Sequence, residues 1–181
     1  MALDLKIKTN SEAIKKRFNR IERKFPSIIN KGILQAGFQL LDIIRTKTAK
    51  GIDFRNVPFA TYSKSYRKQL QREGKPLKVD LFYSGRMLGA LTPSPRTVRK
   101  TGKNKISIGF SNSQMRQRAL FNQVLNEPKR EFFGFNDRTE KIISKQFNRF
   151  IAKEFKKQRL WVYEKILHQI YYLPFQVLVA Q

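Results

Sequence analysis

Apolar residues at helical spacing constrain the fold of this chain more than any other feature. Between residues 27 and 50 they lie along one side of a helix, at Ile29, Ile33, Ala36, Gly37, Leu40 and Ile44. This spacing predicts an amphipathic helix that buries its apolar side against other elements. Gly32 and Gly37 lower the helix propensity of the segment, and close packing against another backbone would explain their presence. We expect this helix to form the centre of the core and to stop at Gly51.

A separate, shorter helix is predicted directly before it. Its apolar stripe has helical spacing and consists of Ile14, Phe18, Ile21 and Phe25. Because proline lacks a backbone N–H and clashes with the preceding turn, we expect Pro26 to end this helix and Ser27 to cap the next one. Before both helices, alternating apolar and polar residues at 3–7 indicate a short strand.

The rest of the chain is expected to combine helices with a hairpin. The predicted helices cover 63–73, 84–91, 114–125, 137–157 and 160–172. Ser84 is the expected cap of the second of these helices, and Asn136 or Asp137 that of the fourth. Strands 97–100 and 105–110 flank the turn 101–104, so that Ile106 and Ile108 share one face, and a closing strand is expected at 175–179. The core stripe of the fourth helix consists of Ile143, Phe147, Phe150, Ile151 and Phe155.

Positive charge is the dominant feature of the composition. The chain has 38 Lys and Arg against 13 Asp and Glu, which gives a formal net charge of +25. A folded surface with this excess repels itself and attracts polyanions, so nucleic acid and acidic protein surfaces are the natural partners. The alternative is a basic surface that is merely solvated. Composition alone does not distinguish this surface from one that binds a polyanion. Hydrophobic residues make up 40% of the chain, which suffices for a core and excludes wholesale disorder.

The residues that catalysis would need are not gathered in the sequence. Cysteine is absent, which excludes disulfides, thiolate zinc sites and a cysteine nucleophile. His168 is the single histidine and lies in an apolar segment, so we expect a structural role for it. No glycine-rich phosphate-binding motif occurs, and Glu22, Asp53 and Asp80 are isolated acids rather than a metal-binding set. We therefore expect no enzyme activity, no metal and no cofactor.

Three blocks of residues in the middle of the chain form a recognisable pattern. The first block consists of Gly51, Asp53, Pro58, Phe59, Ser63 and Tyr66. The second consists of Leu81, Ser84, Gly85, Met87 and Leu88, followed by Ile106–Gly109. The third runs from Ala119 through Phe121 to Asn122 and continues with Pro128, Arg130, Glu131, Phe132, Gly134 and Asp137. In their order and spacing the blocks resemble the phage virion morphogenesis, or tail completion, family. The chain departs from the family in lacking a glycine soon after Asn122 and in continuing past the usual last helix into 158–181.

The resemblance implies an α+β fold, with long helices packed on a small antiparallel sheet and a helix-rich C-terminal extension. It divides the chain into a tail-completion-like domain, 1–157, and an extension, 158–181, that makes contacts between subunits. The implied function is that of a structural virion protein of the phage neck or tail. Copies of it would form a ring that completes or terminates the tail and joins it to the head connector around the DNA channel.

The resemblance also implies the partners. These are other copies of the chain in a hexamer or dodecamer, portal, connector or adaptor proteins, tail tube or other tail proteins, and DNA phosphates in the channel. The implied location is the virion neck or tail, assembled in the host cytoplasm. No membrane partner is expected, because no apolar run approaches the roughly 18 residues of a membrane span. The alternative function is a basic DNA-binding protein without sequence specificity, and a Mg²⁺-dependent nuclease is a third, disfavoured class.

Several residues of the blocks have a physical interpretation of their own. Arg130 and Glu131 interrupt an otherwise apolar run, which favours a fixed ion pair or a backbone anchor, with an exposed loop pair as the alternative. Ser84 is interpreted as a helix cap rather than a nucleophile. Phe132, Phe133 and Phe135 pack either in the core or between subunits, and the sequence does not separate these two roles.

Overall fold

The computed structural model describes residues 11–82, 84–157 and 177–179 of the chain. At 11–14, 17, 18, 21 and 177–179 it describes the backbone alone. The strand predicted at 3–7, the helix predicted at 160–172 and His168 lie outside the described residues. Among the residues described, no helix combines the length and the apolarity that crossing a membrane requires.

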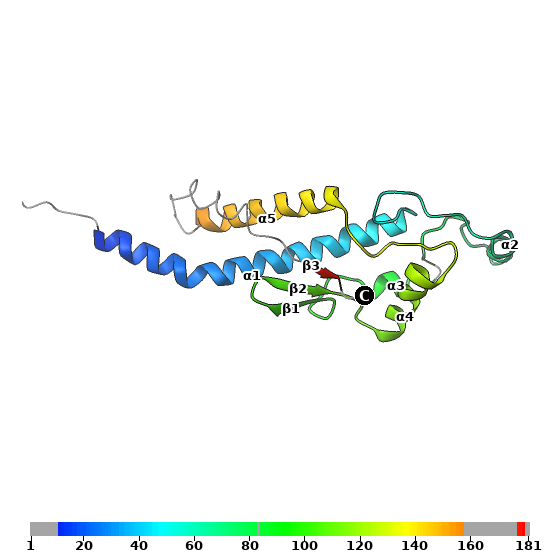
Figure 1. Ribbon diagram of the computed structural model, residues 1–181, viewed down its shortest axis with the longest axis horizontal. Coiled ribbons are helices and arrows are strands. Elements are labelled where there is room, and N and C mark those ends of the chain that lie inside the picture. The colour runs from blue at the N-terminus through cyan, green and yellow to red at the C-terminus, as the bar shows by residue number, and fades with distance from the viewer. Residues whose placement is uncertain (1–10, 83, 158–176, 180–181) are drawn as a thin grey trace, which may run out of the picture.

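A single long helix, α1 (Ser11–Ala49), runs along most of the length of the molecule (Figure 1). The predicted break at Pro26 is therefore wrong, and Ser27 lies inside the helix instead of capping it. A proline inside a helix costs about 3 kcal/mol, so packing on both sides of it has to offset that cost. Phe25 stacks on Phe155 with ring centroids 5.9 Å apart, and Ile28 and Ile29 are buried directly after the proline. The predicted end of the helix is confirmed, because Gly51 follows α1 at a φ of +79°.

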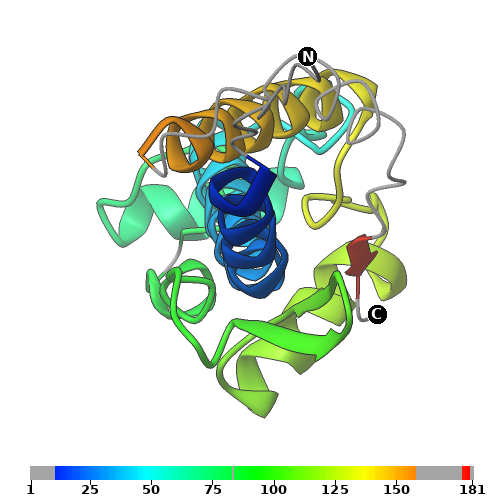
Figure 2. The same cartoon turned by 90° about the vertical axis from the view of Figure 1, so that its left-hand side faces the viewer.

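The described elements form three layers with α1 in the middle. The helix α5 (Asp137–Lys157) packs along one side of α1, and the sheet lies on the other side, as the view along α1 shows (Figure 2). Asn136 is the N-cap of α5, since its Oδ1 accepts the Thr139 N–H at 2.9 Å, and Asp137 is the first helical residue. There its negative charge suits the positive end of the helix dipole.

The sheet consists of the predicted hairpin and the predicted closing strand, which the structure describes at 177–179. β1 (Val98–Gly102) and β2 (Lys105–Ile108) pair antiparallel, and β3 (Val177–Val179) joins β2 in parallel. Ile106 and Ile108 are both buried on the face toward α1, as their alternation predicts. The α+β fold class, with long helices packed on a small sheet around an antiparallel pair, is confirmed.

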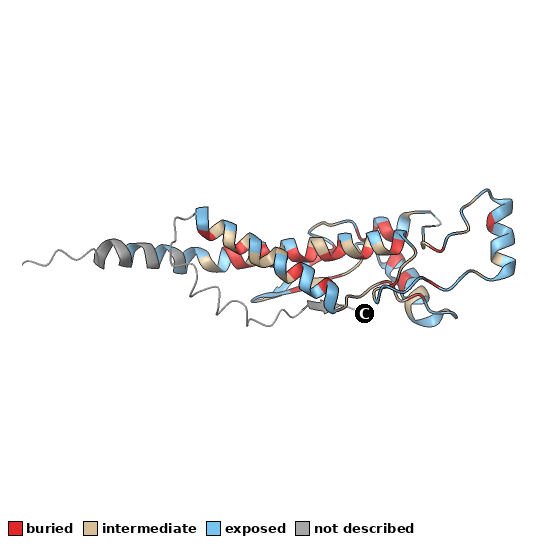
Figure 3. Ribbon diagram, turned by 90° about the horizontal axis from the view of Figure 1, so that it is seen from above, coloured by how far each residue is buried: buried red, intermediate tan, exposed pale blue. Residues whose placement is uncertain are grey.

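The core lies between these layers, where α1 is buried on two sides (Figure 3). The two glycines of α1 lie at its closest contacts. A Cβ on Gly32 would lie 2.8 Å from Cε2 of Phe147 on α5, and one on Gly37 would lie 2.6 Å from Cδ1 of Ile106 on β2. Close packing therefore explains both glycines, although side chains approach them rather than another backbone.

Short helices connect these layers and surround one end of the molecule. They are α2 (Lys64–Arg72), α3 (Arg86–Gly89) and α4 (Ser113–Leu120), which continues into the π-helical turn η1 (Phe121–Leu125). α2 projects from the end of the molecule (Figures 1 and 3) and has Ser63 as its N-cap. The capping role predicted for Ser84 is wrong. Gly85, at φ +68°, is the N-cap of α3, and no side chain caps that helix.

Replacing Gly37 with alanine is expected to destabilise the protein by about 1–3 kcal/mol, the usual cost of overpacking a core. The new methyl group would lie 2.6 Å from Ile106 and 2.7 Å from Val98. Gly89→Ala is the matched control, because Gly89 is also helical but has no atom within 4 Å of an added Cβ. Urea unfolding followed by circular dichroism measures both variants. Equal stabilities would show that the hairpin does not pack this closely on α1.

Candidate functional site

The first block forms a closed loop directly after α1. At a φ of +79°, Gly51 has a conformation that costs glycine little, and a Cβ there would lie 2.8 Å from the Val79 carbonyl oxygen. The loop then returns on itself, since the Phe59 N–H donates to the Gly51 carbonyl at 2.8 Å. Ile52 and Pro58 form an antiparallel bridge across it. The position therefore requires glycine for the loop to close.

Asp53 fastens the inside of this loop. The residue is 8% exposed, and its Oδ1 accepts the Val57 N–H at 2.7 Å. Its own backbone N–H donates to the Val57 carbonyl at 2.8 Å, and Arg55 Nε lies 3.5 Å from Oδ2. These bonds account for both carboxylate oxygens, so Asp53 has a structural role.

The third block holds this loop in place. The Phe54 N–H donates to the Glu131 carbonyl at 3.1 Å, the Arg55 guanidinium pairs with the Glu131 carboxylate, and Asn136 Nδ2 donates to the Phe54 carbonyl at 2.9 Å. Gly134 leaves room for the Phe54 ring, because a Cβ there would lie 2.9 Å from Cγ of that ring. The first and third blocks are therefore one structural unit.

Lys47 supports the same unit from α1. Its Nζ donates to Thr139 Oγ1 at 3.1 Å and to the Phe54 carbonyl at 3.4 Å. Burial lowers the pKa of Lys47, the neighbouring Arg138 charge lowers it further, and Asp53 acts in the opposite direction. The ammonium group therefore joins α1, the loop and α5 at one point.

Phe132 belongs to the core rather than to a surface. It is 1% exposed, and its ring lies 6.5 Å from that of Phe110 and 6.4 Å from that of Phe133. Phe133 and Phe135 are partly buried and pack against the same core. Of the two roles left open by the sequence, core packing accounts for Phe132.

The isolated acids of the sequence do not converge. Asp80 Oδ1 accepts the Phe82 N–H at 2.9 Å, whereas Asp53 is used inside its own loop, and Glu22 is exposed on α1. Within 11–82, 84–157 and 177–179, no group of three or more His, Cys, Asp or Glu residues could hold a metal ion. The described geometry thus offers no carboxylate set for metal-assisted cleavage of a phosphodiester.

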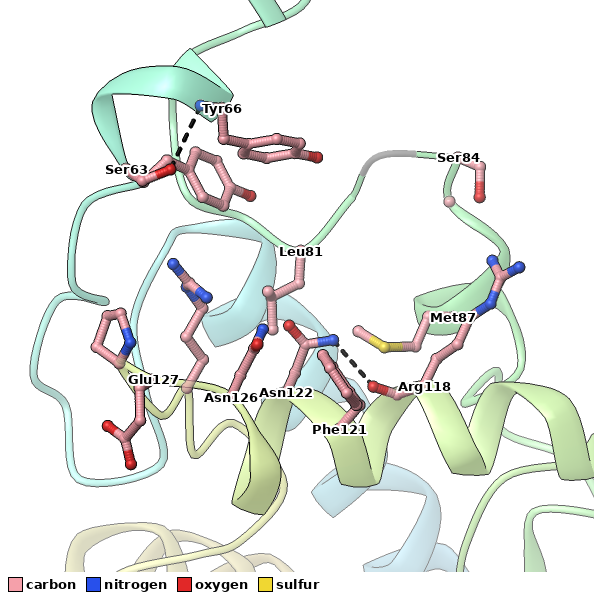
Figure 4. Close-up of a pocket in the computed structure, with 14 residues that line it drawn as sticks. Ser63, Tyr66, Leu81, Ser84, Met87, Arg118, Phe121, Asn122, Asn126 and Glu127 are labelled. Carbon is pink, nitrogen blue, oxygen red and sulfur yellow. Dashed lines mark hydrogen bonds between the residues drawn. The ribbon is translucent and has the colours of Figure 1, made fainter. Parts of the chain in front are cut away.

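A pocket of about 480 Å³ lies where all three blocks meet (Figure 4). Ser63 and Tyr66 come from the first block, Leu81, Ser84, Gly85 and Met87 from the second, and Asn122, Pro128 and Arg130 from the third. Tyr62, Arg118, Phe121, Asn126 and Glu127 complete the lining. A volume of this size is typical of ligand-binding clefts. The pocket is therefore a candidate functional site of the described residues.

Arg130 is the most unusual residue of this pocket. It is 6% exposed, its Nε is buried without a hydrogen-bond partner, and no carboxylate of the described residues pairs with it. Its guanidinium carbon lies 5.1 Å from the centre of the Tyr62 ring. The sequence favours a fixed ion pair or a backbone anchor for Arg130 and Glu131. Glu131 forms its ion pair with Arg55, 76 positions away. The Arg130 side chain forms neither an ion pair nor a hydrogen bond to the backbone of the described residues.

The energetics of Arg130 are unfavourable in the isolated chain. Burying an ion costs several kcal/mol, and a cation–π contact returns only about 0.5–2 kcal/mol. An arginine cannot escape this cost by losing its proton. Leu81, on the wall of the same pocket, has a φ of +54°, which a bulky residue rarely adopts. The buried charge of Arg130 and the unfavourable backbone conformation of Leu81 thus lie in the same pocket, and such features are common at binding sites.

Tyr62 lies between Arg130 and the first block. Its ring meets that of Tyr66 edge-on, with centroids 4.9 Å apart. Burial raises the pKa of Tyr62, and Tyr66 and Asp80 raise it further, while the positive Arg130 and a hydrogen bond with the Leu81 backbone lower it. The phenol is therefore neutral at physiological pH and available as a hydrogen-bond donor.

A strip of exposed apolar side chains borders the pocket. It comprises Leu120, Phe121, Val124 and Leu125, at the end of α4 and along η1. Their exposed fractions range from 45% to 63%, and Phe121 also lines the pocket. We call these four residues the apolar strip.

Compared with known protein families, curated proteins and solved structures, the chain matches none of them. The resemblance to tail completion proteins therefore rests on the quoted residues alone.

Asp53→Ala is expected to lower the free energy of unfolding by about 1–2 kcal/mol, because it removes a buried hydrogen-bond acceptor that closes the loop. Asp80→Ala is the control, since its carboxylate also accepts a nearby N–H but in an exposed turn. Denaturant unfolding of both variants measures the difference. A larger loss for Asp80→Ala would contradict the role given to Asp53.

The pKa of Tyr62 is expected to lie above the ordinary tyrosine value and to rise further in Arg130→Met, because the variant loses a charge that favours the phenolate. Tyrosine ring-carbon NMR shifts followed against pH measure this, with the exposed Arg149→Met as control. Because the folded pKa is raised, the stability that Tyr62 contributes is complete below the unfolded-state pKa. It is lost as pH rises through the folded pKa. An unchanged Tyr62 pKa in Arg130→Met would place the guanidinium away from this ring.

Proposed function

We propose that this chain is a non-enzymatic structural subunit of a phage neck or tail. Its copies pack around a symmetry axis in a ring that completes or terminates the tail and joins it to the head connector. Neighbouring copies contact one another through apolar surface, and the ring leaves a channel for DNA. The resemblance of the three blocks to tail completion proteins names this class.

The observation that supports the proposal best is the apolar strip. Single exposed apolar side chains are ordinary on protein surfaces, but a contiguous group of large ones marks a contact surface. The strip lies on a chain with a net charge of +25, where apolar surface is poorly placed unless another chain covers it. Contacts through 158–181 remain part of the proposal, outside the described residues.

The charge of the chain determines how such a ring would assemble. Like-charged subunits repel one another, so the basic faces need acidic neighbours or DNA phosphates close by. α2 is an example, because it projects from the end of the molecule and carries four exposed cations, Lys64, Arg67, Lys68 and Arg72. We expect portal, connector or tail proteins to supply the compensating acidic surface at the neck.

A basic DNA-binding protein is the competing function, and the projecting α2 is the feature that favours it. Such a protein would hold duplex DNA with an affinity that falls steeply with salt. A neck subunit is instead expected to co-purify with virion proteins in a fixed number of copies. Mass spectrometry of purified particles makes this comparison, and absence of the chain from the particles would contradict the proposal.

Self-association of the free protein is expected to be poor at about 0.1 M salt and to increase near 1 M, where the Debye length falls from about 10 Å to about 3 Å. Sedimentation velocity measures this. Leu125→Glu is expected to abolish the high-salt association, because it puts a charge into the apolar strip. Ile142→Glu, an exposed apolar position on α5 outside the strip, is the matched control. Monodisperse rings at low salt, or unchanged association of Leu125→Glu, would count against the proposed assembly.

A further inference from the structure

We propose that the Arg130 pocket binds a single carboxylate side chain of a partner polypeptide, on a segment whose neighbouring side chains are apolar. The observation behind this is the combination of a buried arginine, whose Nε has no hydrogen-bond partner and whose side chain forms no ion pair with the described residues, with a pocket of about 480 Å³ that it lines. The inference stands on the pocket alone, and it holds whether or not the chain works in a virion.

The charge of the pocket requires an anion. Arg130 carries a guanidinium group, is 6% exposed, and has no carboxylate partner within the described part of the chain. Arg118 adds a second cation to the lining, and it extends toward the segment of Ser84 in Figure 4. Glu127 is the only acid of the lining, and its carboxylate is turned away from Asn122 and Asn126 (Figure 4). Asp80 acts on Tyr62 from nearby, but its carboxylate accepts the Phe82 N–H. The pocket therefore keeps an unsatisfied positive charge.

The neutral groups of the pocket suit a carboxylate with a carbon chain attached. Tyr62, Ser84, Asn122 and Asn126 offer hydroxyl and amide groups that can donate to a second carboxylate oxygen. The remaining wall is apolar and consists of Leu81, Met87, Phe121 and Pro128. The planar guanidinium matches a carboxylate with two parallel hydrogen bonds, while the apolar wall would cover the methylene groups of the side chain and its neighbours.

The same features favour a protein over a nucleic acid as the source of the anion. A nucleic-acid backbone carries a phosphate at every nucleotide and is held by a row of exposed cations along a groove. Here Arg130 is buried and stands against an aromatic ring, and Arg118 is the other cation of the described lining rather than part of a row. A side chain of glutamate length can enter such a recess without bringing further charges with it. Phe121 also belongs to the apolar strip, so a bound segment would continue from the pocket onto apolar surface.

The experiment uses the full chain and two capped pentapeptides, acetyl-Gly-Leu-Glu-Leu-Gly-amide and its Gln counterpart, which differ only in the carboxylate. Two-dimensional NMR of the arginine Nε–H groups follows each titration, and inorganic phosphate and a short DNA duplex are titrated in parallel. We expect the Glu peptide to shift the Arg130 Nε–H signal and to bind roughly tenfold or more tightly than the Gln peptide, the effect of a charge-assisted pair.

Variants separate the pocket from the general positive charge of the protein. Arg130→Met is expected to weaken Glu-peptide binding by roughly tenfold or more, whereas the exposed Arg149→Met, which loses the same charge, is expected to leave it within about twofold. The melting temperature of Arg130→Met without peptide is expected to be no lower than that of the original chain, because an unpaired buried charge is removed.

Three results would overturn the proposal. The first is equal binding of the Glu and Gln peptides, which needs no variant and so does not depend on how Arg130→Met folds. The second is equal loss of binding in Arg130→Met and Arg149→Met. The third is a shift of the Arg130 signal by phosphate or by the DNA duplex but not by the Glu peptide, which would assign the pocket to a phosphate group instead.

Discussion

The two-sided burial of α1 is the constraint on which the rest of the structure depends. Ile29, Ile33 and Leu40 are buried along it, and its glycines admit Phe147 from one layer and Ile106 from the other. Among the described elements, α5 forms the layer on one side of α1 and the hairpin the layer on the other, and each of them packs on α1. Burial of this apolar surface is what allows a helix to continue through Pro26 and a strongly charged chain to fold.

The same helix determines where the candidate site lies. The chain leaves α1 at Gly51 and closes the loop around Asp53, and the loop is tied to the segment around Glu131 through Phe54 and Arg55. Fixing Glu131 also fixes its neighbour Arg130, whose guanidinium lies against the Tyr62 ring. The loop therefore serves as a support for the pocket rather than as a site of its own.

The sequence predicted features that depend on neighbours along the chain. Helical spacing identified the core side of α1 and α5, the helix predicted from residue 63 was found, and the hairpin followed from its turn. Of the two caps left open for α5, Asn136 is the one observed. Prediction from the sequence failed where contacts between residues far apart in the chain determine the structure. Local rules place a helix end at Pro26, yet packing of Phe25 on Phe155, far away in sequence, overrides them. The partner of Glu131 and the environment of Arg130 are likewise long-range, and no spacing pattern marks Tyr62 or Arg118 as members of a pocket.

The pocket and the apolar strip each lack a partner within the described part of the chain. The positive charge of the pocket has no counter-charge there, and the apolar strip is not covered by other described residues. Arg130 is buried, its Nε has no hydrogen-bond partner and no described carboxylate pairs with it, whereas Leu125 and its neighbours keep their apolar surface in water. The pocket and the apolar strip adjoin each other, because Phe121 belongs to both. A free monomer gains nothing from either, whereas a second polypeptide that brings a carboxylate and apolar side chains would satisfy both at once. The contact with other chains that we propose therefore lies at the junction of α4, η1 and the Arg130 segment.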